Sequence, residues 1–461
     1  MKIKFLGFIL EIPDLRQYRQ FLSKNDRRKL CTDLNTDKGR ALADSKYATK
    51  LKLQKSKVSV APLISRIKDR QGLRKFNWQK LDDNFVIKPA YGYGGEGILI
   101  IRKKAKKPNY WIKMDRSLIS LDEIKRHCMD IFSGKYSLHD KPGVVLVEER
   151  IKIHPKFFAF TRSGTPDVRV ILYKKIPVMA MLRIPTEESD GRANLEQGAM
   201  GLGIDLASGL TTYAVAGKSK LVDTIYSYKL KGKRGVAGIR IPEWRKVLET
   251  SIMCAMAVPE LGFMGVDIVL DKERGPVVLE INARPGLSIQ ICNKAGLKGR
   301  IEKLEDMEVN SVVHAYNICR YLFGEKVVGG NNTKDTPVVK PIERVEFVGT
   351  KKNVTVRAKV DTGAFRSSMD YDLAEKLGLL SEDKILYYRN VRSALGKHME
   401  RPVVGATFIL AGKKVRSEIN VVSRKNLKTK VLIGRKDLRG FVVKLAVSRT
   451  KVKDFVKKLK Q

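Results

Sequence analysis

Residues 265–290, GVDIVLDKERGPVVLEINARPGLSIQ, decide the fold of this chain. Apolar and polar residues alternate along two short arms of the stretch, and the charged segment 271–275 separates the arms. Strict alternation in two neighbouring runs is typical of antiparallel strands, because successive side chains of a strand point to opposite faces. The stretch therefore predicts a β-hairpin.

The register of this hairpin follows from the length of its loop. A four-residue loop over 272–275 sets Asp267 opposite Glu280 and Gly265 opposite Asn282. Because side chains alternate along each strand, Asp267, Glu280 and Asn282 then share one face. Gly265 has no side chain and leaves room for a ligand beside Asn282.

Two carboxylates on this face indicate a metal site. Asp267 and Glu280, placed directly opposite each other, repel at a cost of up to about 1 kcal/mol. A divalent cation removes the repulsion, and Asp267, Glu280 and Asn282 form a hard oxygen site that suits Mg²⁺ or Mn²⁺. A solvated polar face is the alternative for such a hairpin. The turn NARPG at 282–286 and a glycine-rich motif upstream favour the metal.

The glycine-rich motif joins the apolar strand 85–89, which carries Lys88, to the loop AYGYGGEG at 90–97. The glycines of the loop are Gly92, Gly94, Gly95 and Gly97. Glycine lets backbone N–H groups approach phosphate oxygens, and the lysine adds a positive charge. A strand follows, and Gly-Lys-Ser/Thr is absent, so the motif is neither a Rossmann turn nor a P-loop. It predicts a hairpin that clamps a nucleotide.

Residues from 46 to 303 resemble the ATP-grasp superfamily, in particular its α-L-glutamate ligase-like and sugar-transfer-associated members. The matching blocks, in the order in which the family shows them, are FVIKPAYGYGGEGILII, VLVEERI, PDVRVILY, MAMLRIPT, DGRANLEQGA and GVDIVLDKERGPVVLEINARPGLSIQ. The resemblance implies an α+β fold with ATP and Mg²⁺ as cofactors. It also implies that ATP phosphorylates a carboxylate, which an amine then attacks.

The resemblance assigns roles to further residues. Lys88 and the glycine loop are expected to hold phosphates, and the backbone of Glu149 and Arg150 is expected to bond the adenine edge. Ribose, phosphate and substrate-side contacts are expected from Asp167, Arg169, Arg183, Arg192 and Asn194. A polar strand end or a solvated surface position is the alternative for each of these. Lys46 lies where the family places another lysine, but here we favour a solvated helix face.

The region from about residue 341 to 447 has the pattern of a small, mostly β unit. An alternating strand over 354–359 runs into Asp361-Thr362-Gly363, and the apolar run 431–433 ends in Gly434. This pattern resembles the retropepsin-like aspartic protease fold, close to domains labelled ATP-dependent zinc proteases, although no zinc pattern is present. One Asp-Thr-Gly supplies only one carboxylate, so a catalytic dyad at Asp361 requires a homodimer. A binding module with a protease fold is the alternative.

Length and composition limit the remaining organisation. A chain of 461 residues exceeds one compact core, so several domains are expected. We predict an N-terminal helical segment, an ATP-grasp domain, a linker, a retropepsin-like domain and a basic tail, at 1–80, 81–323, 324–340, 341–447 and 448–461. We expect no signal peptide and no membrane span. Five scattered cysteines suit reduced thiols and a cytoplasmic location.

The net charge of +42 is compatible with two explanations. Such a field attracts a polyanion such as RNA or the ribosome, but a proteome that is basic throughout would give the same value. The sequence thus predicts an ATP- and Mg²⁺-dependent carboxylate–amine ligase, acting on an amino-acid, peptide or protein carboxylate, with an appended retropepsin-like domain. The alternatives are a nucleic-acid- or ribosome-binding protein with a vestigial ATP site, and phosphotransfer to a sugar or lipid.

Overall fold

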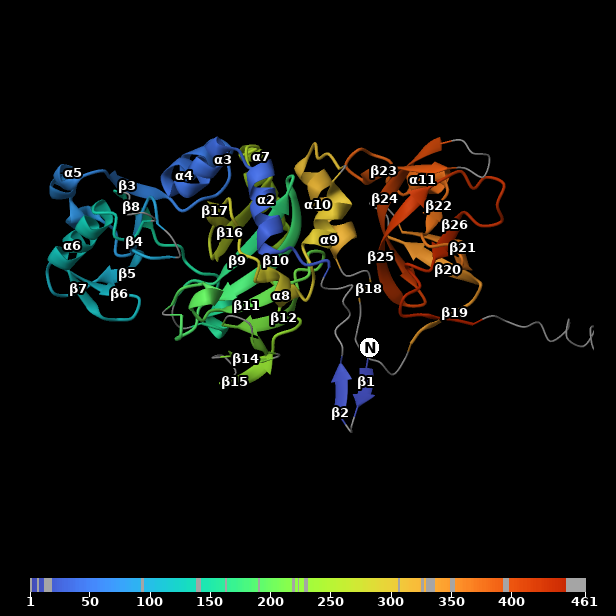
Figure 1. Cartoon of the computed structure of the whole chain (residues 1–461), viewed down its shortest axis with the longest axis horizontal. Coiled ribbons are helices and arrows are strands. Elements are labelled where there is room, and N and C mark those ends of the chain that lie inside the picture. Colours follow the sequence, from blue (N-terminus) through green and yellow to red (C-terminus); the bar gives the residue numbers. More distant parts are fainter. Residues whose placement is uncertain are drawn as a thin grey trace, which may run out of the picture. The chain divides into compact units, whose positions relative to one another are not determined.

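The computed structural model of the chain divides into two compact units, 1–316 and 317–461 (Figure 1). It describes residues 2–5, 8–11, 19–92, 95–137, 142–161, 164–189, 191–217, 220–222, 224–227, 231–305, 307–324, 327–328, 336–348, 353–392 and 398–444. Gly94, the tail 448–461 and most of the predicted linker lie outside these ranges. The predicted domain limits stay predictions.

The first unit contains a six-stranded sheet covered on one face by α6 (Leu121–Phe132). Its strands in spatial order are β3 (Leu63–Ile67), β8 (Val145–Glu149), β4 (Phe85–Pro89), β5 (Leu99–Lys104), β6 (Tyr110–Lys113) and β7 (Leu118–Ser120). Phe85 and Ile87 of β4 pack with Val145 and Val147 of β8 in one apolar core. Because side chains alternate, Lys88 and Glu148 belong to the opposite face.

A second, seven-stranded sheet is antiparallel throughout. Its strands in spatial order are β13 (Lys220–Val222), β12 (Thr211–Ala216), β11 (Met200–Ile204), β10 (Ile176–Ile184), β9 (Asp167–Tyr173), β16 (Phe263–Asp271) and β17 (Gly275–Asn282). Helix α7 (Trp244–Ala257) packs against β9, β10, β16 and β17. The β16–β17 hairpin is therefore tied to the rest of the sheet through β9.

Short helices complete the first unit. On the N-terminal side they are α2 (Lys24–Leu34), α3 (Asp37–Asp44), α4 (Lys46–Lys55) and α5 (Arg70–Lys75), and on the C-terminal side α8 (Ile289–Asn293), α9 (Lys298–Ile301) and α10 (Val312–Phe323), which runs on into the second unit. Ser45 ends α3 and caps α4, where its hydroxyl accepts from the Ala48 amide. Two hairpins, β1 (Lys2–Phe5) with β2 (Phe8–Glu11) and β14 (Thr224–Ser227) with β15 (Gly232–Gly235), stand apart from the large sheets. All five cysteines are free and buried.

The register of β16 and β17 agrees with the sequence at the site and differs at the turn. Asp267 pairs with Glu280, and Gly265 pairs with Asn282, as predicted. The loop was predicted to have four residues, which is wrong: Asp271 pairs with Gly275, so the loop is 272–274. A β-bulge next to Asp267 restores the register, because it adds one residue on β17. Gly275 has a φ of 72° at the end of the tight turn, which favours glycine.

The second unit is a closed barrel. Pairing runs through β25 (Lys413–Val421), β22 (Ser368–Met369), β26 (Val431–Gly434), β21 (Val354–Asp361), β20 (Ile342–Phe347) and β24 (His398–Leu410), and β24 returns to β25. Outside this ring are β18 (Val327–Val328), β23 (Ile385–Arg392), the pair β19 (Val338–Val339) and β27 (Val442–Val443), and α11 (Tyr371–Lys376). The predicted α+β fold class with a mostly β C-terminal domain is confirmed. None of the helices in the described ranges is long and apolar enough to cross a membrane.

Candidate active site

Lys88, predicted to hold phosphate, is held by a buried carboxylate. Its ammonium lies 2.8 Å from Glu148 Oε2, and both side chains are almost inaccessible to solvent. The other oxygen of Glu148 lies 3.0 Å from the ammonium of Lys50, on α4. Glu148 therefore bridges two lysines from different elements, on the sheet face opposite α6. No role was predicted for Glu148, which shares a face with Lys88 because β4 pairs with β8.

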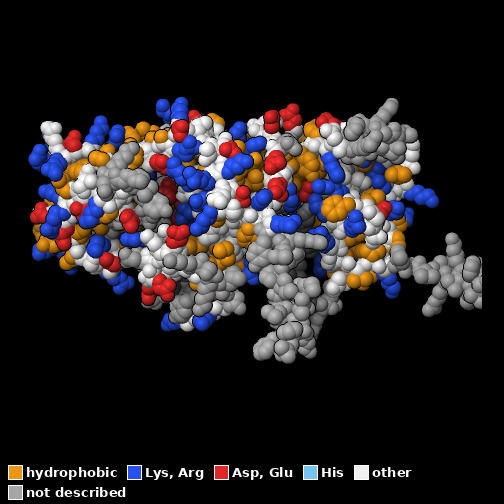
Figure 2. All heavy atoms as spheres, in the orientation of Figure 1, with side chains coloured by type: hydrophobic (Ala, Val, Ile, Leu, Met, Phe, Trp, Pro, Cys, Tyr) orange, Lys and Arg blue, Asp and Glu red, His pale blue; other side chains and the backbone are white. Residues whose placement is uncertain are grey.

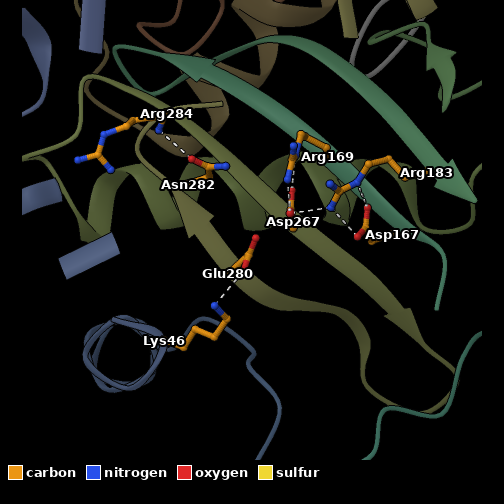
Figure 3. Close-up of polar contacts among 8 residues, drawn as sticks. All are labelled: Lys46, Asp167, Arg169, Arg183, Asp267, Glu280, Asn282 and Arg284. Carbon is orange, nitrogen blue, oxygen red and sulfur yellow. Dashed lines mark hydrogen bonds and ion pairs between the residues drawn. The ribbon is translucent and has the colours of Figure 1, made fainter. Parts of the chain in front are cut away.

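Lys46 joins the glycine loop to the β16–β17 hairpin. Its Nζ donates to the Gly92 carbonyl at 2.9 Å. The same Nζ lies 3.5 Å from Glu280 Oε2 (Figure 3). The side chain of Lys46 is only 13% exposed, so the solvated helix face that we favoured for it is wrong. The position of Lys46, where the family places a lysine, was the feature of the sequence that could have predicted this contact.

Two glycines of the loop have a backbone conformation that favours glycine. Gly95 and Gly97 have φ of 82° and 70°, where a larger residue would be strained. A Cβ on Gly97 would also lie 2.7 Å from the Tyr136 ring, and the carbonyl of Gly97 lies 3.0 Å from His127 Nε2. The loop is thereby anchored to α6 and the turn after it.

Two aspartates and two arginines, of which only Arg169 is partly accessible to solvent, form a network on β9, β10 and β16 (Figure 3). Arg183 binds both oxygens of Asp167 at 2.6 Å and also donates to Asp267 at 2.6 Å. Arg169 binds both oxygens of Asp267, at 2.7 and 2.6 Å. Two positive and two negative side chains leave the network neutral, which buried charges require.

The ionisation of the two aspartates differs. Burial, opposed by the Arg183 guanidinium, raises the pKa of Asp167 to about 6. Burial also acts to raise the pKa of Asp267, but the guanidiniums of Arg169 and Arg183 outweigh it and hold that pKa well below the ordinary value. Asp267 is therefore a carboxylate at neutral pH.

The predicted metal ligands differ in how well they fit a divalent cation. Glu280 is half-exposed, and its nearest cation, Lys46, is beyond ordinary hydrogen-bond distance at 3.5 Å. Asn282 lies two residues along the same strand, where its Oδ1 accepts from the Arg284 amide at 2.8 Å. Both side chains offer oxygen to a hard ion. Asp267 already accepts from guanidinium groups on both oxygens, so its role as a ligand stays a prediction. Within the described ranges, no three His, Cys, Asp or Glu side chains group as a metal site.

The remaining predicted residues contact other parts of the protein. Asn194 caps the 3-10 turn Leu195–Gln197, accepting from the Glu196 amide at 3.1 Å, and Arg192 lies in the same loop. Glu149 pairs with Arg274 of the β16–β17 turn, and Arg150 donates to Met114 Sδ at 3.2 Å. Their nucleotide- and substrate-side roles stay predictions.

In the barrel, Asp361 ends β21 directly beside Gly434 of β26. Its Oδ1 accepts from the amides of Gly363 and Ala364 at 3.0 Å, and Oδ2 lies 3.3 Å from Lys359 Nζ. The Ala364 amide first, with Lys359 and Gly363, holds the pKa of Asp361 below its ordinary value. The single carboxylate is therefore ionised and stabilised within its own turn.

These features define an ATP-grasp fold followed by a retropepsin-like barrel, as predicted. The chain belongs to the sugar-transfer associated ATP-grasp family, whose model matches residues 25–306, more than half of its length. A second model, described as the retropepsin-like aspartic endopeptidase RimB, matches residues 370–456. No curated protein matches the chain.

Solved structures with similar chains include ligases and a protein of unknown function. The ATP-grasp ligase PsnB complexed with a minimal precursor is 16% identical, with 59% of this chain and 62% of that chain covered and a TM-score of 0.32. A D-alanine–D-alanine ligase from Bacillus anthracis is 13% identical, with 63% and 73% covered and a TM-score of 0.32. The protein Lpg0085 of unknown function from Legionella pneumophila is 21% identical, with 25% and 97% covered and a TM-score of 0.18. The match thus spans less than two thirds of the PsnB chain.

Proposed function

We propose that the first unit is an ATP- and Mg²⁺-dependent carboxylate–amine ligase of the α-L-glutamate ligase-like type. The observation that carries the proposal is the position of Lys46, whose ammonium contacts the glycine loop of one sheet and Glu280 of the other. A phosphate chain held by the loop would lie beside the two oxygen donors of β17. Membership of the ATP-grasp family supports nucleotide binding at this place.

The residues present suit transfer of a phosphoryl group to a carboxylate. Lys46 and Lys88 supply positive charge for the phosphates, and Glu280 and Asn282 would hold Mg²⁺, which neutralises charge on the transferred group. Arg183 and Arg169 lie on the same sheet face and are fixed in orientation by Asp167 and Asp267. The carboxylate oxygen bonds to the γ-phosphorus as ADP leaves, and an amine then displaces phosphate from the acyl phosphate.

A panel assay tests the proposal. Purified full-length protein is incubated with ATP, Mg²⁺ and pairs of amino-acid or peptide carboxylates and amines, and phosphate release and new amide bonds are measured. We expect release that depends on both substrates. Phosphate transferred stably to a sugar or lipid acceptor would instead support the phosphotransfer alternative, and absence of any nucleotide binding would support a vestigial site.

We propose that the barrel of a single chain does not cleave peptides. Asp361 is ionised and bonded within its own turn, whereas an aspartic dyad needs two adjacent carboxylates that share one proton. We expect the full-length chain to be inactive on an unstructured peptide library at concentrations where sedimentation shows a monomer, and Asp361→Asn to change nothing there. Cleavage at concentrations where the chain is a monomer would contradict this proposal. Cleavage that appears only with dimerisation and disappears in Asp361→Asn would instead assign the barrel a protease activity that needs two chains.

The charge of the chain supports a second candidate function, RNA binding. Figure 2 shows lysine and arginine side chains spread over the visible face. The hairpin β5–β6 is more concentrated: residues 99–114, LIIRKKAKKPNYWIKM, carry six basic residues and no carboxylate. Lys103 and Lys106 of this hairpin are exposed. A basic ribbon of this kind can follow a phosphate backbone.

The salt dependence of RNA affinity tests this function. We expect affinity for single-stranded RNA to fall steeply with salt, and the double variant Lys103→Glu, Lys106→Glu to lower the log–log slope by about 0.7 for each phosphate that the variant no longer neutralises. The matched control is Lys425→Glu, Lys428→Glu, which changes the same charge at exposed positions of the barrel. Equal effects of the two double variants on RNA affinity, or an affinity that does not change with salt, would indicate that the net charge does not serve RNA binding.

A further inference from the structure

Lys50 is a buried lysine to which the proposed reaction gives no role. It lies one helical turn after Lys46 on α4, and only 5% of it is exposed. Its ammonium donates to the Ala61 carbonyl and lies 3.0 Å from Glu148 Oε1. A lysine is rarely buried to this extent unless it is paired, because removing its charge from water is costly. Glu148 is therefore the group that allows Lys50 to be buried with its charge.

Glu148 cannot neutralise both of its partners. It is 3% exposed and contacts Lys50 through one oxygen and Lys88, at 2.8 Å, through the other. Two ammonium groups and one carboxylate leave a net charge of +1 in a nearly dry place. One further negative charge would neutralise these three side chains. A phosphate held by the glycine loop could supply it, because Lys88 lies directly before that loop.

We propose that Glu148 and Lys50 are positioning residues for the nucleotide phosphates: Glu148 fixes the ammonium of Lys88, and Lys50 fixes Glu148. This inference rests on the proposed nucleotide site. Lys50 acts through Glu148 rather than by touching phosphate, because its own ammonium is already enclosed by Glu148 and the Ala61 carbonyl.

The arrangement links nucleotide binding to a proton. Burial lowers the pKa of Lys50 to about 8, against the attraction of Glu148 and together with the repulsion of Lys88. These two groups, from β8 and β4, are the charges that shift its pKa; Glu280, on β17, contacts Lys46 instead. A phosphate bound at Lys88 brings negative charge near Lys50 and raises its pKa again. Nucleotide binding should therefore take up a proton near pH 8 and above.

Calorimetry of ADP binding with Mg²⁺, in buffers of different ionisation enthalpy, measures this uptake. For the wild-type full-length chain we expect proton uptake on ADP binding that increases from pH 7 to pH 9 and stays below one proton per nucleotide. Lys50→Arg keeps the positive charge but cannot release its proton in this range, so it should bind ADP without the uptake. Glu148→Gln should weaken ADP binding about 10–100-fold, the loss seen when a metal ligand loses its orienting partner, because the ammonium of Lys88 is then no longer fixed. Lys55→Met, at an exposed position of the same helix, is the control and should match wild type.

The outcomes separate this inference from the proposed function. Wild-type chain that binds ADP with the same proton uptake as a folded Lys50→Arg variant would overturn the role of Lys50. Unchanged affinity in a folded Glu148→Gln variant would overturn the role of Glu148. Either result leaves the nucleotide site in place. Wild-type chain that does not bind ADP or ATP would overturn the proposed function, and this inference with it.

Discussion

Glu280→Gln is expected to lower Mg²⁺-dependent ATP turnover at least about 100-fold while the fold stays intact. Glutamine has the shape of glutamate but lacks the charge that a divalent cation needs. Glu280 is half-exposed, and Lys46 connects it to the glycine loop. Turnover is measured as phosphate release with the substrates that the panel identifies. Binding of Mn²⁺ in the presence of ADP, followed by electron paramagnetic resonance, reports the metal independently of turnover.

The control for this substitution lies in the same hairpin. Glu273 is in the β16–β17 turn, where it is exposed and pairs with Lys152 at 2.9 Å. Glu273→Gln should keep both turnover and Mn²⁺ binding. Near-wild-type phosphate release by Glu280→Gln would show that Glu280 is not a metal ligand. The assignment of Asn282 as a ligand would then lose its main support.

Arg183→Met is expected to destabilise the first unit by about 3–5 kcal/mol. Arg183 makes three bonds of 2.6 Å to two aspartates that are 4% and 2% exposed. Removing its charge leaves Asp167 without its bidentate partner and Asp267 with Arg169 alone. Urea unfolding of the full-length chain, followed by hydrogen exchange of peptides from β9, β10 and β16, measures the loss for this unit separately from the barrel.

The pH dependence of this variant has a definite sign. A buried aspartate without its partner binds a proton more readily in the folded state, so its pKa rises further and stability falls as pH increases through the carboxylate range. The destabilisation of Arg183→Met should thus be smaller at pH 5 than at pH 7. Arg245→Met removes an exposed arginine paired with Glu249 on α7 and should change stability by no more than about 0.5 kcal/mol. A loss for Arg183→Met as small as this would show that the network carries little stability.

The local pattern of the sequence was sufficient to predict several of the helices and strands. Ser120 and Glu123, three residues apart, form a capping box at the start of α6, where each side chain accepts from the other's backbone amide. The apolar run 431–433, which ends in Gly434, forms β26 (Val431–Gly434). Alternation in the β16–β17 arms placed Asp267 opposite Glu280. These features depend on residues close in sequence, whose spacing is set by the geometry of one helix or one strand pair.

The same hairpin shows the limit of that reasoning. The predicted register came from a loop one residue too long, and the bulge beside Asp267 compensated for it. A bulge shifts one strand by one residue, and the alternation of short arms is too brief to reveal it. The sequence also assigned Asp267 to a metal, without the information that Arg169 and Arg183, on two other strands, reach its oxygens.

What the sequence by itself determined is the family, the order of its motifs and the face on which each strand residue lies. Only the tertiary structure decided which charged groups meet. Lys50 and Glu148 are far apart in the chain and come from a helix and a strand, and Lys46 reaches both Gly92 and Glu280. Such contacts depend on how α4 packs between the two sheets, because a charge is neutralised by whichever group packing brings within a few ångströms. The spacing of residues along the chain does not predict that distance.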